Sequence, residues 1–374
     1  MPDRVRAVRL SVADVTPWTR WLFVEIETEE GRKGVGEGSL AGREQDVADA
    51  VRALAPALFR LAEADPLALQ RPALDGLVGA AAFSAVDQAL WDLAAQRQQV
   101  RLADALGTVR RDRIPLYANV NRRTRDRLPS GFAASAQDAL AAGHQAIKIA
   151  PFDEATPASP VVEPGLARIR AVRDAIGPER RLMVDCHWRL DEPASRRVIE
   201  AAAEIGVHWV ECPLPETAAN IPTLVRLRGL ANARGVLTAG CEKEIGLAGF
   251  EPFLSAGAYD VLMPDAKYVG GLVEMLRVAQ RMQRAGAKFS PHNPSGPVCH
   301  AVSLHLCAVV PDLHSLETQF DESPLFDTLV GQRLQHAEAG MARLPEGVGL
   351  GLTLQPSELE ACRSVAWEAV REES

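Results

Sequence analysis

The sequence predicts an α/β protein in which a (β/α)8-type barrel is joined to a small α+β domain. From Ile114 to Thr318, short β-rich runs alternate with helical stretches, and eight such runs can be counted. The residues before position 114 have a different pattern, in which two alternating strands are followed by two helices. At about 150 residues per domain, a chain of 374 residues has room for both parts.

The N-terminal region is expected to form the α+β domain. Its strands are expected at Val5–Val15 and Trp21–Thr28, and its helices at Glu44–Glu63 and Ala80–Gln98. Four glycines between positions 34 and 42 suggest a phosphate loop. However, they do not fit Gly-x-Gly-x-x-Gly, and the acidic Glu37 lies among them. We therefore assign no nucleotide binding to this segment.

The barrel strands are expected to follow one another along residues 114–319. They are Ile114–Val120, Gln145–Ala150, Arg181–His187, His208–Cys212, Gly235–Gly240, Ala258–Met263, Ala287–Pro291 and Leu313–Thr318. A doubly wound open sheet would need a glycine fingerprint after the first strand, and none follows Val120. The domains are thus expected at 1–113, 114–319 and 320–374, with the last segment returning to the first domain.

Composition excludes several classes of protein. Hydrophobic residues make up 47% and charged residues 24%, as in ordinary globular proteins. Since 41 Lys and Arg stand against 49 Asp and Glu, the net charge of −8 argues against a nucleic-acid partner. The longest apolar stretches are too short to span a membrane, and the first residues do not resemble a signal peptide. Six Cys without a Cys-x-x-Cys pair favour a cytoplasmic protein.

Ionisable residues end seven consecutive barrel strands. They are Lys148, Asp185 with His187, Glu211, Glu242, Asp265, His292 and Glu317. Consecutive strand ends are 23 to 37 residues apart, which is about one βα unit. The carboxyl ends of barrel strands meet at one mouth, where catalysis occurs in this fold. We therefore expect these side chains to form a ring around one site.

Three acids from adjacent strands, Asp185, Glu211 and Glu242, are the expected metal ligands. Three carboxylates gathered in one place need a cation, and ligation by oxygen alone suits Mg²⁺. Each acid has a cysteine next to it in the sequence, which makes zinc the alternative metal. Neighbouring residues on a strand point to opposite sides, so these cysteines are expected in the core and not at the metal.

Two histidines are candidates for acid–base chemistry. His187 lies two residues after Asp185 and is therefore expected on the same strand face. His292 ends the seventh strand, one strand after Asp265, whose carboxylate would fix the tautomer of its imidazole. A single histidine at a strand end is more often structural, but two beside three acids favour catalysis.

Seven segments spread over nearly the whole chain form a recognisable set. They are Ala85–Leu93, Met183–Arg189, Trp209–Pro215, Ala239–Glu242, Met263–Asp265 with the following Gly270-Gly271, Ser290–Pro294 and Glu346–Leu350. Together they resemble the enolase superfamily, specifically its mandelate racemase-like branch. The resemblance implies a modified TIM barrel, one Mg²⁺, and a capping domain built from both ends of the chain. It also implies removal of the proton α to a carboxylate, with Glu317 as the electrophilic partner.

The chain departs from the family at the second barrel strand. The family carries Lys-x-Lys there, and this sequence reads Lys148-Ile149-Ala150, so the second lysine is missing. We expect Lys148 to contact the substrate carboxylate. The loss leaves the two histidines as the acid–base pair, as in galactonate dehydratase and related acid-sugar dehydratases. We expect His187 to remove the α-proton and His292, beside Asp265, to protonate the departing 3-hydroxyl.

The expected function is therefore Mg²⁺-dependent dehydration of an acid sugar to a 2-keto-3-deoxy acid. One alternative is a racemase or epimerase of an α-hydroxy or α-amino acid, and another is a homologue that binds metal and ligand without turnover. A zinc amidohydrolase would need His-x-His on the first strand, but residues 117–121 are Tyr-Ala-Asn-Val-Asn and contain no histidine. Trp18, Arg20 and Asn293 are the further candidates for substrate binding, and relatives of this kind lead us to expect a homo-oligomer.

Overall fold

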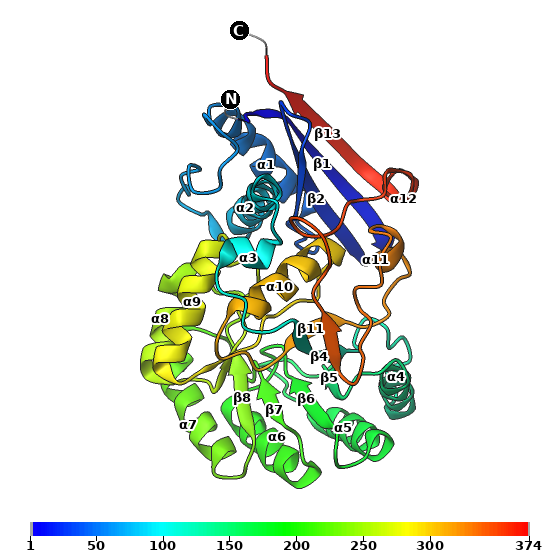
Figure 1. Cartoon of the computed structure of the whole chain (residues 1–374). Coiled ribbons are helices and arrows are strands. Elements are labelled where there is room, and N and C mark those ends of the chain that lie inside the picture. The colour runs from blue at the N-terminus through cyan, green and yellow to red at the C-terminus, as the bar shows by residue number, and fades with distance from the viewer. Residues whose placement is uncertain (1–2, 373–374) are drawn as a thin grey trace.

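Eight parallel strands form the barrel in the order in which they occur in the sequence, within residues 3–372, which the computed structural model describes (Figure 1). They are β4 (Arg113–Asn119), β5 (Ala146–Ile149), β6 (Arg181–Asp185), β7 (Trp209–Glu211), β8 (Leu237–Gly240), β9 (Val261–Leu262), β10 (Lys288–Phe289) and β11 (Leu316–Gln319). The last strand, β11, pairs with the first, β4. A parallel bridge between Phe289 and Leu313 joins β10 to the segment before β11, so the barrel closes. The predicted barrel is confirmed.

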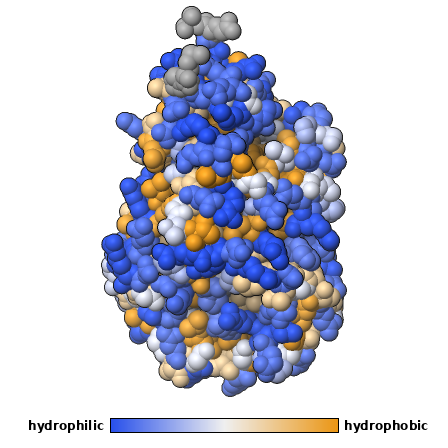
Figure 2. All heavy atoms as spheres, in the orientation of Figure 1, coloured by the Kyte–Doolittle hydropathy of each residue, from blue (hydrophilic) through white to orange (hydrophobic). Residues whose placement is uncertain are grey.

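Helices follow the strands and cover the outside of the barrel (Figure 1). They are α4 (Pro129–Ala141), α5 (Glu163–Ile176), α6 (Glu192–Ile205), α7 (Ile221–Asn232), α8 (Gly246–Ala256), α9 (Leu272–Ala285) and α10 (Pro297–Val309), with a 3-10 turn at Ala218–Asn220. Helix α9 shows why they pack there, since Leu272, Met275, Val278 and Met282 recur at helical spacing and are all buried. No helix within residues 3–372 is long and apolar enough to cross a membrane. The face in Figure 2 is mostly hydrophilic, with small apolar areas between polar groups.

The capping domain is a four-stranded antiparallel sheet made from both ends of the chain. Its strands are β1 (Val5–Thr16), β2 (Thr19–Thr28), β3 (Lys33–Glu37) and β13 (Arg363–Val370), in the order β13-β1-β2-β3. Helices α1 (Glu44–Phe59), α2 (Gly76–Gln98) and α3 (Leu102–Leu106) follow β3. The predicted return of the tail to the first domain is confirmed by the pairing of β13 with β1.

The rest of the tail connects β11 to β13. It contains α11 (Leu325–Thr328), β12 (Met341–Arg343) and α12 (Pro356–Cys362). Strand β12 pairs antiparallel with β4, so this part of the tail lies against the barrel. The domain boundaries after residues 113 and 319 stay a prediction.

The glycines of β3 allow α2 to lie directly on the backbone of this strand. A Cβ atom on Gly36 would stand 1.9 Å from the carbonyl oxygen of Ala85, and one on Gly34 would stand 2.1 Å from that of Ala89. Only glycine permits so close an approach. Gly34 and Gly36, two of the glycines that resembled a phosphate loop, therefore serve helix packing.

Buried carboxyl groups on α2 tie the capping domain to the barrel and the tail. Asp87 accepts a hydrogen bond of 2.7 Å from the backbone N–H of Leu272, the first residue of α9. Asp92 accepts from Val35 on β3 at 3.1 Å and from Leu350 at 2.9 Å. Burial raises the pKa of Asp87 to about 7 and that of Asp92 to about 6. These bonds fix the capping domain over the barrel mouth.

The barrel interior is filled by a separate cluster of apolar side chains below the mouth. It contains Tyr117, Ala146, Met183, Trp209, Ala239, Val261 and Met263. The rings of Tyr117 and Trp209 meet edge to face, with centroids 5.4 Å apart. Met183 precedes Asp185 by two residues and therefore points to the same side of β6 as that acid. Trp209 has the same relation to Glu211 on β7. This cluster is the floor on which the polar site stands.

Candidate active site

A cavity of about 610 Å³ lies between the capping domain and the barrel mouth. The capping domain contributes Trp18 and Arg20 to its lining, from the turn between β1 and β2 and the start of β2. From the barrel side, the lining includes Lys148, Asp185, His187 and His292. Both predicted parts of the site thus face one space.

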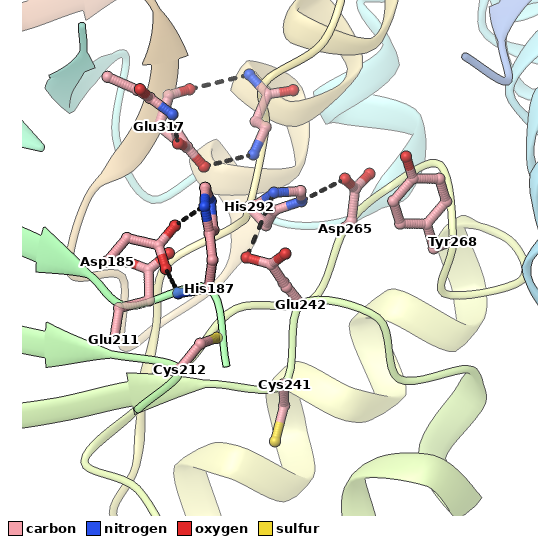
Figure 3. A network of polar contacts seen from close by, with 12 residues as sticks. Asp185, His187, Glu211, Cys212, Cys241, Glu242, Asp265, Tyr268, His292 and Glu317 are labelled. Carbon is pink, nitrogen blue, oxygen red and sulfur yellow. Dashed lines mark hydrogen bonds and ion pairs between the residues drawn. The ribbon is translucent and has the colours of Figure 1, made fainter. Parts of the chain in front are cut away.

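The three predicted metal ligands converge at one end of this site (Figure 3). Asp185 and Glu211 are the last residues of β6 and β7, and Glu242 follows β8 by two residues. Each offers a carboxylate oxygen, and these three atoms lie within 4.8 Å of one another. All three side chains are buried. The spacing in the sequence therefore translates into one compact group of carboxylates.

The chemistry of this group fits a divalent cation. Oxygen Oε2 of Glu242 is buried and has no hydrogen-bond partner within the described part of the chain. Burial raises the pKa of Glu211 and of Glu242 well above the usual range. A hard cation would satisfy the free oxygen and offset the charge, and an all-oxygen set suits Mg²⁺ or a similar ion.

The neighbouring cysteines do not take part in the carboxylate group. Cys186, Cys212 and Cys241 are buried and free, and burial raises the pKa of each thiol well above its usual value. In Figure 3 the sulfur of Cys241 points away from the carboxylates. Cys212 and Cys241 have positive φ angles of 44° and 71° and lie outside the strands. The predicted strand alternation therefore does not apply to Cys212 and Cys241.

Lys148 stands between two carboxylates next to the expected metal position. Its Nζ lies 2.7 Å from Oε1 of Glu211 and 2.8 Å from Oε1 of Glu317. The side chain is 1% exposed. Although burial alone would lower it, the charges of Glu211 and Glu317 raise the pKa of Lys148 well above its usual value. Lys148 is therefore a fixed positive charge at the cavity wall.

His292 and Asp265 form the predicted dyad. Nδ1 of His292 lies 2.8 Å from Oδ2 of Asp265, and Nε2 lies 3.5 Å from Oε2 of Glu242 (Figure 3). Burial lowers the pKa of His292, although the hydrogen bond to Asp265 opposes this. The carboxylate of Asp265 alone would favour the imidazolium cation. Burial outweighs it, so the neutral imidazole is favoured.

His187 reaches Asp185 by a turn and not along a strand. Strand β6 ends at Asp185, and His187 has a φ of 48°, so the prediction that it continues the strand is wrong. Its backbone N–H donates to Oδ1 of Asp185 at 2.8 Å, and its Nε2 lies 2.8 Å from Oδ2. The side chain is 43% exposed toward the cavity that it lines. The turn brings the imidazole back beside the metal ligand.

Glu317 is held by amide groups on the far side of Lys148. It accepts hydrogen bonds from Nδ2 of Asn119 at 2.7 Å and from the backbone N–H of Asn293 at 3.0 Å. Asn293 itself is 1% exposed, donates to the carbonyl of Glu317 at 2.9 Å, and is not part of the cavity lining. The structure therefore places Asn293 behind Glu317, whereas substrate contact was expected of it.

Lys267 is a buried residue of the site that the sequence analysis missed. Its Nζ lies 2.8 Å from Oδ2 of Asp265, the oxygen that His292 also contacts, and it donates to the hydroxyl of Ser295. Burial opposes ionisation of Asp265, but Lys267 and His292 lower its pKa below the usual value. The sequence signal that could have identified Lys267 is its position two residues after Asp265, which suggests that the two side chains lie near each other.

Glu37 links the capping domain to the loop that follows His292. Its carboxylate accepts from the backbone N–H groups of Gly296 at 2.7 Å and Cys299 at 2.9 Å, and from Ser39. Glu37 lies on β3, among the glycines discussed above. The β3 segment thus helps to hold the loop that carries the dyad histidine.

Comparisons with known proteins agree with this architecture. The family "Mandelate racemase / muconate lactonizing enzyme, N-terminal domain" matches residues 2–107, and "Enolase C-terminal domain-like" matches residues 131–358. The D-gluconate dehydratase of Thermoproteus tenax is 29% identical over 365 residues, which cover 92% of this chain and 71% of that protein. The D-galactonate dehydratase of Variovorax paradoxus (strain S110) is 28% identical over 369 residues, covering 95% and 94%.

A solved structure of an enolase superfamily member from Salmonella Typhimurium superposes with a TM-score of 0.86. It is 22% identical and covers 98% of this chain and 100% of the other, which supports the fold alone. The two family matches together span most of the chain. The resemblance inferred from the sequence is thus confirmed, and the chain belongs to the enolase superfamily, in its mandelate racemase-like branch.

Proposed function

We propose that this enzyme is a Mg²⁺-dependent hydro-lyase that dehydrates an acid sugar to a 2-keto-3-deoxy acid. The observation that carries the proposal is the placement of three buried carboxylates and two imidazoles around one cavity. The names of the two dehydratases reported above support it. Dehydration of this kind requires loss of the proton α to a carboxylate and departure of the neighbouring hydroxyl.

The carboxylates Asp185, Glu211 and Glu242 would hold Mg²⁺. When bound, the ion supplies positive charge against the negative charge that develops on the substrate carboxylate. Lys148 adds a second fixed positive charge at the same end of the cavity. Preorganised charges of this kind are usually the largest single contribution to catalysis.

The geometry of the dyad makes His292 the better candidate for the base. Because Oδ2 of ionised Asp265 accepts a hydrogen bond from Nδ1 of His292, the neutral imidazole carries its proton on Nδ1. Its lone pair is then on Nε2, which faces Glu242 and the cavity. His187, paired with Asp185 and exposed to the cavity, is the better candidate to protonate the leaving 3-hydroxyl. This reverses the assignment expected from the sequence.

The test is an assay for 2-keto acid. The purified enzyme with added Mg²⁺ is given a panel of aldonic and aldaric acids, and product is trapped as its semicarbazone. We expect one substrate or a few related ones to yield 2-keto acid. Incorporation of solvent deuterium at Cα without any keto acid would indicate a racemase or epimerase instead, and binding without either would indicate a non-catalytic homologue.

A metal-ligand variant separates the metal from the rest of the proposal. Glu211→Gln should lower the affinity for Mg²⁺ at least tenfold by calorimetry and abolish turnover, because a neutral amide replaces an anionic ligand. Glu244→Gln is the matched control, since Glu244 lies nearby but outside the three-carboxylate group. Unchanged Mg²⁺ affinity in Glu211→Gln would contradict the assignment.

A further inference from the structure

The loop that follows β4 concentrates arginine beside the cavity. Four arginines occur between positions 122 and 127, and Arg122, Arg125 and Arg127 line the cavity. All but Arg125 are held by carboxylates. The three ion pairs are Arg122–Glu322 (3.1 Å), Arg123–Asp321 (3.2 Å) and Arg127–Asp153 (2.7 Å). This loop therefore has one guanidinium that the protein does not neutralise within residues 3–372.

That guanidinium belongs to Arg125, which rests on an aromatic ring from the capping domain. Its Cζ lies 4.9 Å from the ring centroid of Trp18. Trp18 is 73% exposed and lines the same cavity. A tryptophan face holds a guanidinium in place without using its N–H donors. The donors of Arg125 remain available for a ligand.

A second cation, Lys243, lies at the cavity wall in a comparable setting. Its Nζ is 3.9 Å from the ring centroid of Trp188, and among residues 3–372 it has no carboxylate partner within ion-pair distance. The acids of the lining are Asp185, at the metal end, and Glu322, which already pairs with Arg122 and accepts from Thr19. The lining thus offers neither cation an uncommitted carboxylate.

The distribution of charge indicates what fills the cavity. A sugar acid with one carboxylate places it near the metal ligands and Lys148, and its other groups are neutral hydroxyls. Hydroxyls are recognised equally well by neutral donors and acceptors, whereas a guanidinium fork matches a carboxylate or phosphate. Arg125 lies against Trp18 of the capping domain, whereas Lys243 directly follows the proposed ligand Glu242, and both cations line the cavity. Together they are complementary to a second anion.

We propose that the substrate is an acid sugar with a second anionic group at the end of its chain far from the metal. Arg125, seated on Trp18, binds this terminal group, and Lys243 adds positive charge. The chemistry is that of an aldaric acid or of an aldonic acid phosphorylated at its last carbon. This inference rests on the proposed dehydration and adds the substrate class.

The test compares substrates that differ only at the far end. D-Gluconate is compared with D-glucarate and with 6-phospho-D-gluconate, and D-galactonate with galactarate. We expect at least one anion-terminated acid to exceed its aldonate at least tenfold in kcat/KM for keto-acid formation. The two aldarates and the phosphate ester show which kind of anion is recognised.

Variants assign the preference to Arg125. Arg125→Gln should lower the kcat/KM ratio of the anion-terminated acid over its aldonate at least tenfold, and Arg125→Lys should retain part of it. Arg123→Gln is the matched control, because Arg123 lies in the same loop, is already paired with Asp321 and does not line the cavity. It should leave the ratio unchanged.

The outcomes separate this inference from the proposed function. If the aldonates and the anion-terminated acids are dehydrated with equal kcat/KM, the proposal of a second anionic group is wrong and the proposed dehydration stands. The same holds if Arg125→Gln lowers kcat/KM equally for both kinds of substrate. If none of these acids yields keto acid, calorimetry of D-glucarate and D-gluconate with Mg²⁺ present decides. Tighter binding of glucarate that is lost in Arg125→Gln would support the anion site, and equal binding would overturn it.

Discussion

Two buried ammonium groups organise the polar residues of the site. Lys148 is shared between Glu211 and Glu317, and Lys267 lies beside Asp265 and the hydroxyl of Ser295. A buried charge is tolerated only when it is paired and hydrogen-bonded, and each ammonium favours the ionised form of the carboxylates that it contacts. The pKa values of Glu317 and Asp265 are lowered, although burial still raises that of Glu211. The acid–base histidine therefore depends on a residue that never touches the cavity.

Lys267→Met should lower kcat between ten- and a hundredfold while KM changes little. Without the ammonium, Asp265 becomes a buried carboxylate with a raised pKa, and it orients the imidazole of His292 less well. The measurement is steady-state kinetics on the best substrate, with circular dichroism to verify folding. Lys288→Met, at an exposed position on β10, is the control. A folded Lys267→Met enzyme with normal kcat would show that Lys267 is merely structural.

The division of labour between the histidines can be separated by isotope exchange. His292→Asn should lose both Cα deuterium exchange and dehydration, because the base that removes the α-proton is gone. His187→Asn should lose dehydration and retain some exchange, since the proton can still leave and return. Proton NMR in deuterated buffer measures both. Exchange that survives only in His292→Asn would restore the assignment made from the sequence.

At the scale of elements, the strands place the site residues, and the pattern of the sequence was sufficient to find them. Asp185, Glu211 and Glu242 end apolar runs one βα unit apart, which is why their convergence could be predicted. The strands themselves are shorter than predicted; β9, for example, covers Val261–Leu262 within the expected Ala258–Met263. Apolar residues that flank these strands are buried in the core but form no strand pairing. The periodicity of the sequence does not distinguish a buried residue that pairs in the sheet from one that does not.

What the sequence could not supply is the direction of side chains in loops. His187 turns back through a positive φ that non-glycine residues rarely adopt, and no pattern signals it. Arg125 differs from three nearby arginines only in lacking a carboxylate, which depends on how the loop folds. Lys267 could have been identified from its spacing of two residues from Asp265. That its ammonium group is buried beside Asp265 is visible only in the structure.

The contact between β3 and α2 predicts a strongly position-dependent effect of a single methyl group. Gly36→Ala should lower the free energy of unfolding by about 2–3 kcal/mol, because its Cβ would meet the carbonyl of Ala85. Gly229→Ala is the matched control. Gly229 lies within α7 with nothing near its Cβ position, so alanine there should stabilise by about 0.5–1 kcal/mol. Urea unfolding measures both, and similar effects would contradict the tight packing.

At the scale of the whole molecule, His305 on α10 joins α3 of the capping domain to the tail. Its Nδ1 accepts from the backbone N–H of Ala103 at 3.3 Å, and its Nε2 faces the carbonyl of Leu350 at 3.3 Å. Only the neutral imidazole can accept on one side and donate on the other. Burial lowers the pKa of His305 to about 4, well below the 6.5 of an exposed histidine.

This depressed pKa makes the contribution of His305 to stability dependent on pH. Between pH 6.5 and about 4 the unfolded chain binds a proton that the folded protein does not, so stability is lost as the pH falls. His305→Gln removes this titration. The variant should therefore be less stable than the wild type at pH 7.5, and the gap should narrow by pH 4.5, by at most about 1.4 kcal/mol per pH unit. A gap that stays constant in urea unfolding would contradict the assignment.

Because β13 borders β1, the capping sheet unites residues from opposite ends of the chain (Figure 1). During synthesis, roughly 20 to 70 s separate translation of β2 from that of β13, at about 5–20 residues per second. In that interval one edge of β1 lacks its final neighbour, and an unpaired edge can pair with other chains. The turn that carries Trp18 joins β1 to β2, so a growing polypeptide that already contains every candidate catalytic residue still awaits its last strand before the roof of the cavity is complete.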